Sequence, residues 1–237
     1  MIPAPFIRAL HSGTVDVPLL MGNMAEEPDA GPAMEVASYS SEQFLKLLQQ
    51  TFEPWGSDVG NNIYELYATV SAINPQIAYD QIISDYGLTC AFIDLGRTAD
   101  MIDGGSYSSP VYIHYNNWGF ANPIVESNGW TSHYAHHGSD LMLLLESWGS
   151  HYQPDQRDFL GAASIQKIFF AFVNTNGRYM SDAFGITTFS DSSGWPSNYS
   201  TISIEYPSPR MRTNLKKEVC EYFTKIGINS PKFWWEN

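Results

Sequence analysis

Two segments of the chain carry side chains that suit acid–base chemistry. Residues 22–29 hold a cluster of carboxylic acids, and residues 133–140 hold three histidines close together: Glu26, Glu27 and Asp29; His133, His136 and His137. A histidine can accept a proton near neutral pH, and a carboxylate can fix the tautomer of its ring. Each segment alone is also what an ordinary solvated surface loop would contain, so the chemistry depends on whether the fold brings them together.

The three histidines do not have the spacing of a metal site. Zinc enzymes of the zincin type place two histidines four residues apart on one helix face, and structural zinc sites add cysteines. His133, His136 and His137 fit neither pattern. We therefore expect no metal ion and no cofactor.

Both segments follow apolar runs that are typical of buried strands. The run Val17–Met21 ends at Gly22, just before the acids, and the run Pro110–Tyr115 lies some twenty residues before the histidines. In α/β sheets the functional loops follow the carboxyl ends of the strands. The two loops therefore qualify as parts of one site.

Helical patterns fill most of the sequence between these strands. Ser40 and Gln43 form a capping-box pattern, after which Phe44, Leu48 and Phe52 recur at helical spacing up to Pro54. Further patterns predict these helices and one more strand: a helix through residues 63–70 closed by Pro75, helix over 76–101 broken near Gly87, helices over 140–148, 155–173 and 212–225, and an edge or half-exposed strand over 201–206. Alternating strands and helices predict an α/β fold, and since we find no repeat or linker, residues 1–237 are read as a single domain.

Charge and hydropathy exclude some function classes. The formal net charge is −13, from 25 acidic and 12 basic residues, and this opposes binding to nucleic acid or to an anionic membrane. No apolar run is long enough to span a bilayer, and residues 1–8 lack the pattern of a signal peptide.

The two cysteines and one glycosylation sequon bear on the cellular compartment. Cys90 and Cys220 lie far apart, so composition leaves open two buried thiols or one long-range disulfide. Asn198-Tyr199-Ser200 is the only sequon, and Asn198 is a candidate glycosylation site.

Taken in order, several segments resemble type-B carboxylesterases and cholinesterases, which have the α/β-hydrolase fold. The Val-Pro strand at 17–18, its glycine and the pair Glu26-Glu27 are similar to the family's acid segment, and His137-Gly138-Ser139-Asp140 is similar to its histidine segment. Three further stretches resemble the family: residues 109–112, residues 172–177, and Gly194-Trp195-Pro196 with Tyr199. The resemblance implies that Glu27 is the acid and His137 the base of a Ser-Glu-His triad. Pro28 stands where the family usually has glycine, so the loop could present Glu26 or Asp29 instead.

The resemblance also implies how the two cysteines are bonded. Cys90 and Cys220 fall where cholinesterases join a mid-chain helix to the C-terminal helix, which implies a disulfide. A disulfide implies an oxidising compartment, and hence the secretory pathway or the extracellular space for the parent protein.

The nucleophile of such a triad is absent from this chain. The family order places the serine before the acid, yet only 26 residues precede Glu27, and no Gly-x-Ser-x-Gly motif occurs; the nearest, Gly105-Ser106-Tyr107-Ser108, has the wrong spacing. We read the chain as the C-terminal half of an α/β-hydrolase domain, inactive alone and acting on a carboxylic ester only when an N-terminal half completes it. The alternative is a non-catalytic cholinesterase-like binding or adhesion module.

A half-domain should expose strand edges that normally pair with upstream strands. Unpaired backbone amides and apolar faces promote association. We therefore expect the isolated chain to self-associate through an exposed sheet edge or to be poorly soluble.

Overall fold

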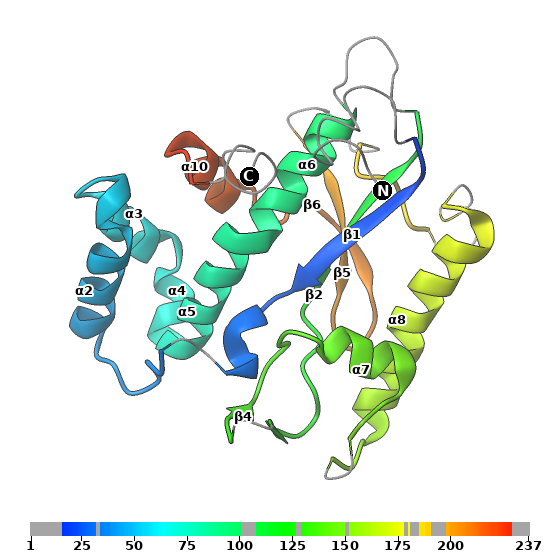
Figure 1. The fold of residues 1–237 in the computed structure, drawn as a ribbon, viewed down its shortest axis with the longest axis horizontal. Helices are drawn as coiled ribbons and strands as arrows, with labels where there is room; N and C mark the ends of the chain where they lie inside the picture. Colours follow the sequence, from blue (N-terminus) through cyan, green and yellow to red (C-terminus); the bar gives the residue numbers. More distant parts are fainter. Residues whose placement is uncertain are drawn as a thin grey trace, which may run out of the picture.

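A computed structural model describes residues 16–31, 34–100, 108–126, 129–149, 152–177, 180, 185–190 and 198–228. The segments at residues 1–8, Ser12-Gly13, Gly105–Tyr107 and Gly194–Pro196, on which parts of the sequence interpretation rest, lie outside the described residues. What is described is a mixed α/β fold in which a small sheet lies between two sets of helices (Figure 1).

The main sheet has the strand order β1-β2-β5-β6. Its members are β1 (Leu19–Met24), β2 (Val111–Asn116), β5 (Ser200–Ile204) and β6 (Arg210–Thr213). β1 and β5 both pair with β2 in parallel, and β6 returns antiparallel to β5. Leu19 lies opposite Val111, and Met24 lies opposite Asn116. The carboxyl ends of β1 and β2 therefore meet at one margin of the sheet.

Both faces of the sheet are buried, which explains why β1 and the first part of β2 read as apolar runs. Along β2, Val111 and Ile113 join one apolar cluster, whereas Tyr112 between them joins the other. In Figure 1, α6 (Cys90–Asp100) lies on one side of the strands, and α7 (Ser139–Leu145) and α8 (Gln156–Thr175) lie on the other. The period of two thus sends alternate side chains into two cores.

The first core is built on helices whose starts and stops follow local sequence signals. The capping box at Ser40 and Gln43 is confirmed: each side chain accepts from the other residue's backbone N–H, and α2 (Ser41–Phe52) buries Phe44, Leu48 and Phe52. The other helices on this side are α3 (Val59–Leu66), α4 (Ala68–Ile73), α5 (Pro75–Ser84) and α10 (Lys217–Lys225), with short 3-10 turns at Glu27–Ala30 and Glu53–Trp55.

Two helix boundaries differ from those expected. Pro75 does not only follow a helix end; it begins α5, where its missing N–H costs nothing, and the Asn74 side chain caps it. The expected break near Gly87 is a π-helical segment, Asp85–Thr89, that joins α5 to α6 without interrupting the helical path. A single π turn absorbs an extra residue while the chain stays helical.

The strands also differ from expectation in two places. β1 runs past Gly22 to Met24, which pairs with Asn116 of β2. Gly22 continues the strand because a Cβ atom at this position would lie 2.1 Å from the carbonyl oxygen of His114. β5 is a fully buried inner strand and not an edge strand, because β6 pairs along its other side. The expected helix over 212–225 starts only at Lys217, since Arg210–Thr213 form β6.

The two edges of the sheet differ in chemistry. β6 carries the exposed Arg210 and Arg212, and both guanidinium groups contact the carboxylate of Glu205. β1 has no charged residue, and in the described part of the chain it pairs only with β2. Charged side chains on an edge strand discourage pairing with another chain, whereas an uncharged edge leaves it possible.

The disulfide expected from the family resemblance is present. Cys90 at the start of α6 is bonded to Cys220 in α10, across 130 residues of sequence. Both cysteines are fully buried in the first core. The bond ties α10 to α6, which packs on the sheet.

Candidate functional site

Glu27 and His137 lie side by side at the carboxyl ends of β1 and β2. The Nδ1 atom of His137 is 2.7 Å from the Oε2 atom of Glu27, across 110 residues of sequence. A carboxylate accepts hydrogen bonds, so Nδ1 carries the proton and Nε2 of the neutral ring is left as an acceptor. The His137 side chain is 79% exposed and that of Glu27 is 13% exposed. The pair therefore presents Nε2 of His137 to solvent as a proton acceptor, while the carboxylate of Glu27 that contacts the ring is largely enclosed.

Local contacts fix the carboxylate of Glu27 in place. Its second oxygen, Oε1, accepts from the backbone N–H of Met24 at 2.8 Å, and its own N–H donates to the hydroxyl of Ser84 in α5 at 2.8 Å. That hydroxyl donates in turn to the carbonyl of Asp80. The backbone of His137 adds a further link, because its N–H donates to the Glu27 carbonyl at 3.1 Å. Both carboxylate oxygens of Glu27 thus already accept hydrogen bonds within the protein.

Pro28 does not displace Glu27 from this position. It lies in the first turn of the 3-10 helix Glu27–Ala30, where a backbone N–H is not needed. Gly31 ends that turn with a positive φ of 135°. The departure from the family pattern is therefore accommodated within the loop.

Glu26 is buried in contacts of its own. Its carboxylate accepts from the side chain of Gln81 at 2.7 Å and from the backbone of Ala135 at 3.3 Å. Burial raises the pKa of Glu26 to about 7, although these hydrogen bonds and the nearby Lys216 oppose the shift. Among the described residues the hydrogen bonds of this carboxylate go to Gln81 and Ala135 and not to a histidine, unlike those of Glu27.

Asp29 holds the histidine loop. Its carboxylate accepts from the backbone N–H groups of His133 and Tyr134 at 2.6 and 2.8 Å, and from the indole N–H of Trp130 at 3.2 Å. The side chain is completely buried. A carboxylate that accepts several N–H bonds fixes the path of a loop. Asp29 therefore orients the segment that ends in His137, a role that the sequence did not reveal.

The other two histidines have separate surroundings. His136 is buried, with Nε2 3.1 Å from the Glu126 carboxylate and Nδ1 3.2 Å from the Tyr134 carbonyl. His133 is exposed and joins the loop through its backbone. Within the described ranges, no group of three or more His, Cys, Asp or Glu side chains is placed to hold a metal ion.

Behind the pair lies a cluster of buried acids from α5 and its π-helical continuation. Burial raises the pKa of Asp80 to about 8, against the hydrogen bonds from Gln76, and the neighbouring Asp29 and Glu26 raise it further. Asp85 accepts from the hydroxyl of Tyr67 at 2.6 Å and pairs with Lys216 at 2.8 Å. Of these two acids, Asp80 is therefore the one whose protonated form burial favours.

No nucleophile accompanies the pair in the described part of the chain. No hydrogen bond to Nε2 of His137 occurs there, and the nearby Ser139 hydroxyl donates to the carbonyl of His136. Ser84 is occupied by Glu27 and Asp80. The acid and the base are in contact, and a third group would have to approach Nε2 from solvent.

Asn198 lies just before β5. Its Oδ1 atom accepts from the Asn214 side chain at 2.7 Å, and Tyr199 and Ser200 of the sequon are buried. Glycosylation at Asn198 stays a prediction.

No protein-family model matches this chain, and no curated protein matches it either. Among the helices of the described residues, none combines the length and the apolar character that crossing a membrane would need. The interpretation of the site therefore rests on its residues and their geometry.

Proposed function

We propose that this chain supplies the acid and the base of a serine carboxylic-ester hydrolase, with the nucleophilic serine provided by a separate N-terminal half. The observation that carries the proposal is the 2.7 Å contact between Glu27 and His137 at the ends of two neighbouring parallel strands, with Nε2 facing solvent. This is the arrangement that a Ser-Glu-His triad needs from its last two members.

Each side chain has a defined role in the proposed reaction. Nε2 of His137 would take the proton from the incoming serine as its oxygen attacks the ester carbonyl, and would give it to the departing alcohol. Water would then release the acid by the same route. Glu27 would keep the proton on Nδ1 and stabilise the imidazolium, while Ser84 and the Met24 amide hold Glu27.

The edge of β1 that has no strand beside it in the described part of the chain suits completion by another strand. Leu19 and Ala25 donate their N–H groups to Pro110 and Asn116 on the β2 side. Because a parallel ladder uses alternate residues, Leu20 and Gly22 direct their backbone groups to the opposite side. A strand added there in parallel would end at the margin where Glu27 and His137 lie.

Reconstitution tests the proposal. We would measure hydrolysis of p-nitrophenyl acetate by the chain alone and after co-expression with the N-terminal half of a type-B carboxylesterase that carries the serine. We expect activity only with both parts. His137→Ala and Glu27→Gln should lower that activity by about 10⁴-fold, as losses of triad members do, whereas His133→Ala at the neighbouring exposed position should leave it unchanged.

A separate readout tests the pair without catalysis. The proton on Nδ1 of His137 should give a downfield NMR resonance that disappears in Glu27→Gln and persists in His133→Ala. If this resonance is present but the two halves together remain inactive, the geometry is right and the catalytic role is wrong.

The second candidate is a non-catalytic binding or adhesion module. It is favoured by the absence, in the described residues, of any hydroxyl group bonded to Nε2. In that case His137→Ala should leave every binding property of the chain intact. Activity in the reconstituted pair would eliminate this candidate.

A further inference from the structure

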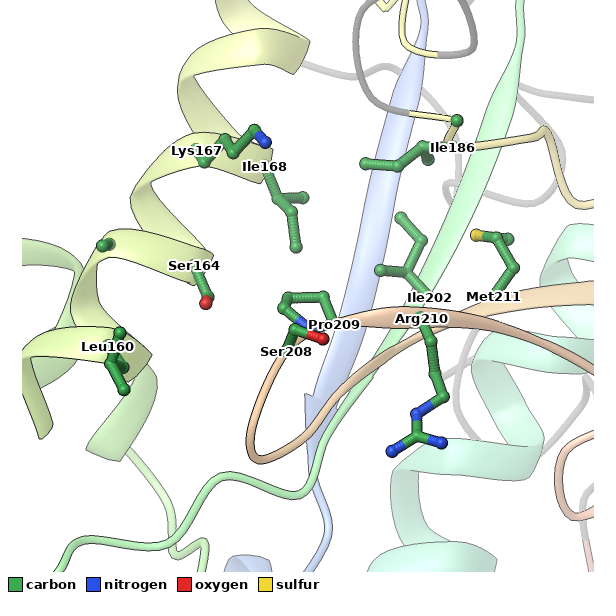
Figure 2. Close-up of a pocket in the computed structure, with 12 residues that line it drawn as sticks. Leu160, Ser164, Lys167, Ile168, Ile186, Ile202, Ser208, Pro209, Arg210 and Met211 are labelled. Atoms are coloured by element: carbon green, nitrogen blue, oxygen red, sulfur yellow. The ribbon is translucent and has the colours of Figure 1, made fainter. Parts of the chain in front are cut away.

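A groove separates α8 from the outer strands on the side of the sheet opposite α6. Its volume is about 600 Å³, in the range of small-molecule sites. Figure 2 shows α8 on one side and the hairpin of β5 and β6 on the other, with the isoleucines between them. α8 leaves this space because it turns the small side chains of Ala163 and Ser164 towards the strands.

The inner surface of the groove is apolar. Ile168 comes from α8, and Ile202 and Met211 lie opposite each other on β5 and β6. Ile186 and Pro209 complete this surface. An aliphatic chain that lies against these side chains would lose its contact with water.

The charged groups of the groove are all cationic. Lys167 and Arg210 are among its lining residues, and no acidic residue is among those that the structure describes there. Arg210 and Arg212 share the single carboxylate of Glu205, which leaves one positive charge in excess. In a chain of net charge −13, an apolar groove with a positive rim is a local exception. Such a rim attracts anions and repels cations.

We propose that this groove binds a free fatty-acid anion. The aliphatic chain lies between α8 on one side and Ile186 and Ile202 on the other, and the carboxylate lies beside Arg210 and the Ser208 hydroxyl at the end of the β5–β6 hairpin. No residue of the groove belongs to the Glu27–His137 pair, and β1, where a completing strand would add, is at the other edge of the sheet. The inference is therefore independent of the proposed ester hydrolysis.

Calorimetric titration with three ligands tests the proposal: two anions that differ in chain length, and a cation with the same chain as the longer anion. Dodecanoate should bind one-to-one. Decanoate should bind more weakly, by up to about fourfold for each methylene removed, which corresponds to about 0.8 kcal/mol per buried CH₂. Dodecyltrimethylammonium, with the same chain and the opposite charge, should bind at least tenfold more weakly. Equal binding of the anion and the cation would overturn the proposal.

Two variants with matched controls locate the site. Ala163→Trp fills the groove from α8 and should weaken dodecanoate binding at least tenfold, whereas Asn174→Trp on an exposed turn of the same helix should not. Arg210→Glu should weaken binding at least tenfold, and Lys46→Glu on the exposed face of α2 should not.

Methyl NMR of Ile168, Ile186 and Ile202 shows the location directly, and thermal unfolding shows that each variant is folded. Dodecanoate that shifts other methyl groups, or that binds Ala163→Trp as tightly as the unsubstituted chain, would refute the groove as the site. Binding to phosphatidylglycerol vesicles without binding to dodecanoate would point to a membrane surface instead and would equally refute it.

Discussion

Glu26 should make the stability of this protein fall as the pH rises from about 5 to 8. Its carboxyl group is almost completely buried, and burial raises its pKa from 4.5 to about 7. A group whose pKa is higher in the folded state stabilises that state below its unfolded pKa, and the contribution is lost as the pH rises through the folded pKa. The affected window for Glu26 therefore runs from about pH 4.5 to 7.

The size of the effect follows from the shift in pKa. Each unit of difference between the folded and unfolded states corresponds to about 1.4 kcal/mol, so Glu26 accounts for about 3 kcal/mol in full and for about 2 to 3 kcal/mol between pH 5 and pH 8. Asp80, with a pKa raised to about 8, acts in the same direction. His114 acts in the opposite direction below about pH 6.5, because burial lowers its pKa to about 4.

The substitution Glu26→Gln isolates one contribution. The glutamine keeps the shape of the side chain and cannot ionise, so the loss of unfolding free energy between pH 5 and pH 8 should be about 2 to 3 kcal/mol smaller than in the unsubstituted chain. Urea unfolding at a series of pH values measures this difference. The comparison cancels His114, whereas Asp80 adds a smaller difference, because the charge of Glu26 contributes to its raised pKa. Glu42→Gln, at an exposed position in the first turn of α2, is the control.

An identical pH dependence in Glu26→Gln and in the unsubstituted chain would refute the reasoning. A lower stability of the variant at all pH values would not refute it. The amide group of glutamine places an N–H donor where Gln81 or Ala135 now donates to the carboxylate, and two donors cannot pair with each other. The slope against pH is the quantity that the burial of Glu26 determines.

Three further perturbations follow from the fold. Reduction of Cys90–Cys220 should lower the unfolding free energy by up to about 5 kcal/mol, measured by urea unfolding with and without dithiothreitol, since the bond closes a long loop. Gly22→Ala should lower the unfolding free energy by more than about 2 kcal/mol and abolish the Nδ1 proton resonance of His137, because the new methyl group would force β1 from β2. Gly87→Ala, with open space around its Cβ, should leave the unfolding free energy unchanged or raise it slightly. Sedimentation velocity of the isolated chain should show association that increases with concentration through the uncharged β1 edge, and a monomer at every concentration would contradict this.

Local signals in the sequence predict where helices and strands lie better than they predict which elements pack beside one another. The capping box at Ser40 and the apolar runs of β1 and β2 lie where periodicity placed them, because both depend on residues close in sequence. The position of β5 inside the sheet was missed. Thr201 and Ser203 alternate with isoleucines as they would on a solvated strand, yet helices cover the sheet and β6 closes the side that was expected to be open.

The same distinction holds for the site. Glu27 and His137 were singled out by a resemblance in sequence, and the structure places them in contact. The sequence does not reveal the residues that hold this pair. The hydroxyl of Ser84 accepts from the Glu27 N–H across 57 residues of sequence, and the carboxylate of Asp29 accepts from the His133 N–H across 104. A serine in a helix and an aspartate in a loop have no local feature that reveals such contacts. These roles exist only once the chain has folded.

The edge of β1 that is unpaired among the described residues allows two kinds of pairing, and they have different consequences for the site. A strand added in parallel would end at the margin of Glu27 and His137, where a nucleophile could reach Nε2. Two copies of the chain that pair β1 with β1 about a two-fold axis would instead run antiparallel, and their two Glu27–His137 pairs would lie at opposite margins of the joined sheet. Met24 limits either pairing, because the N–H that would extend the edge beyond Gly22 is already donated to Glu27. Self-association would therefore cover the edge without completing the site, so a dimer of this chain should be as inactive as its monomer.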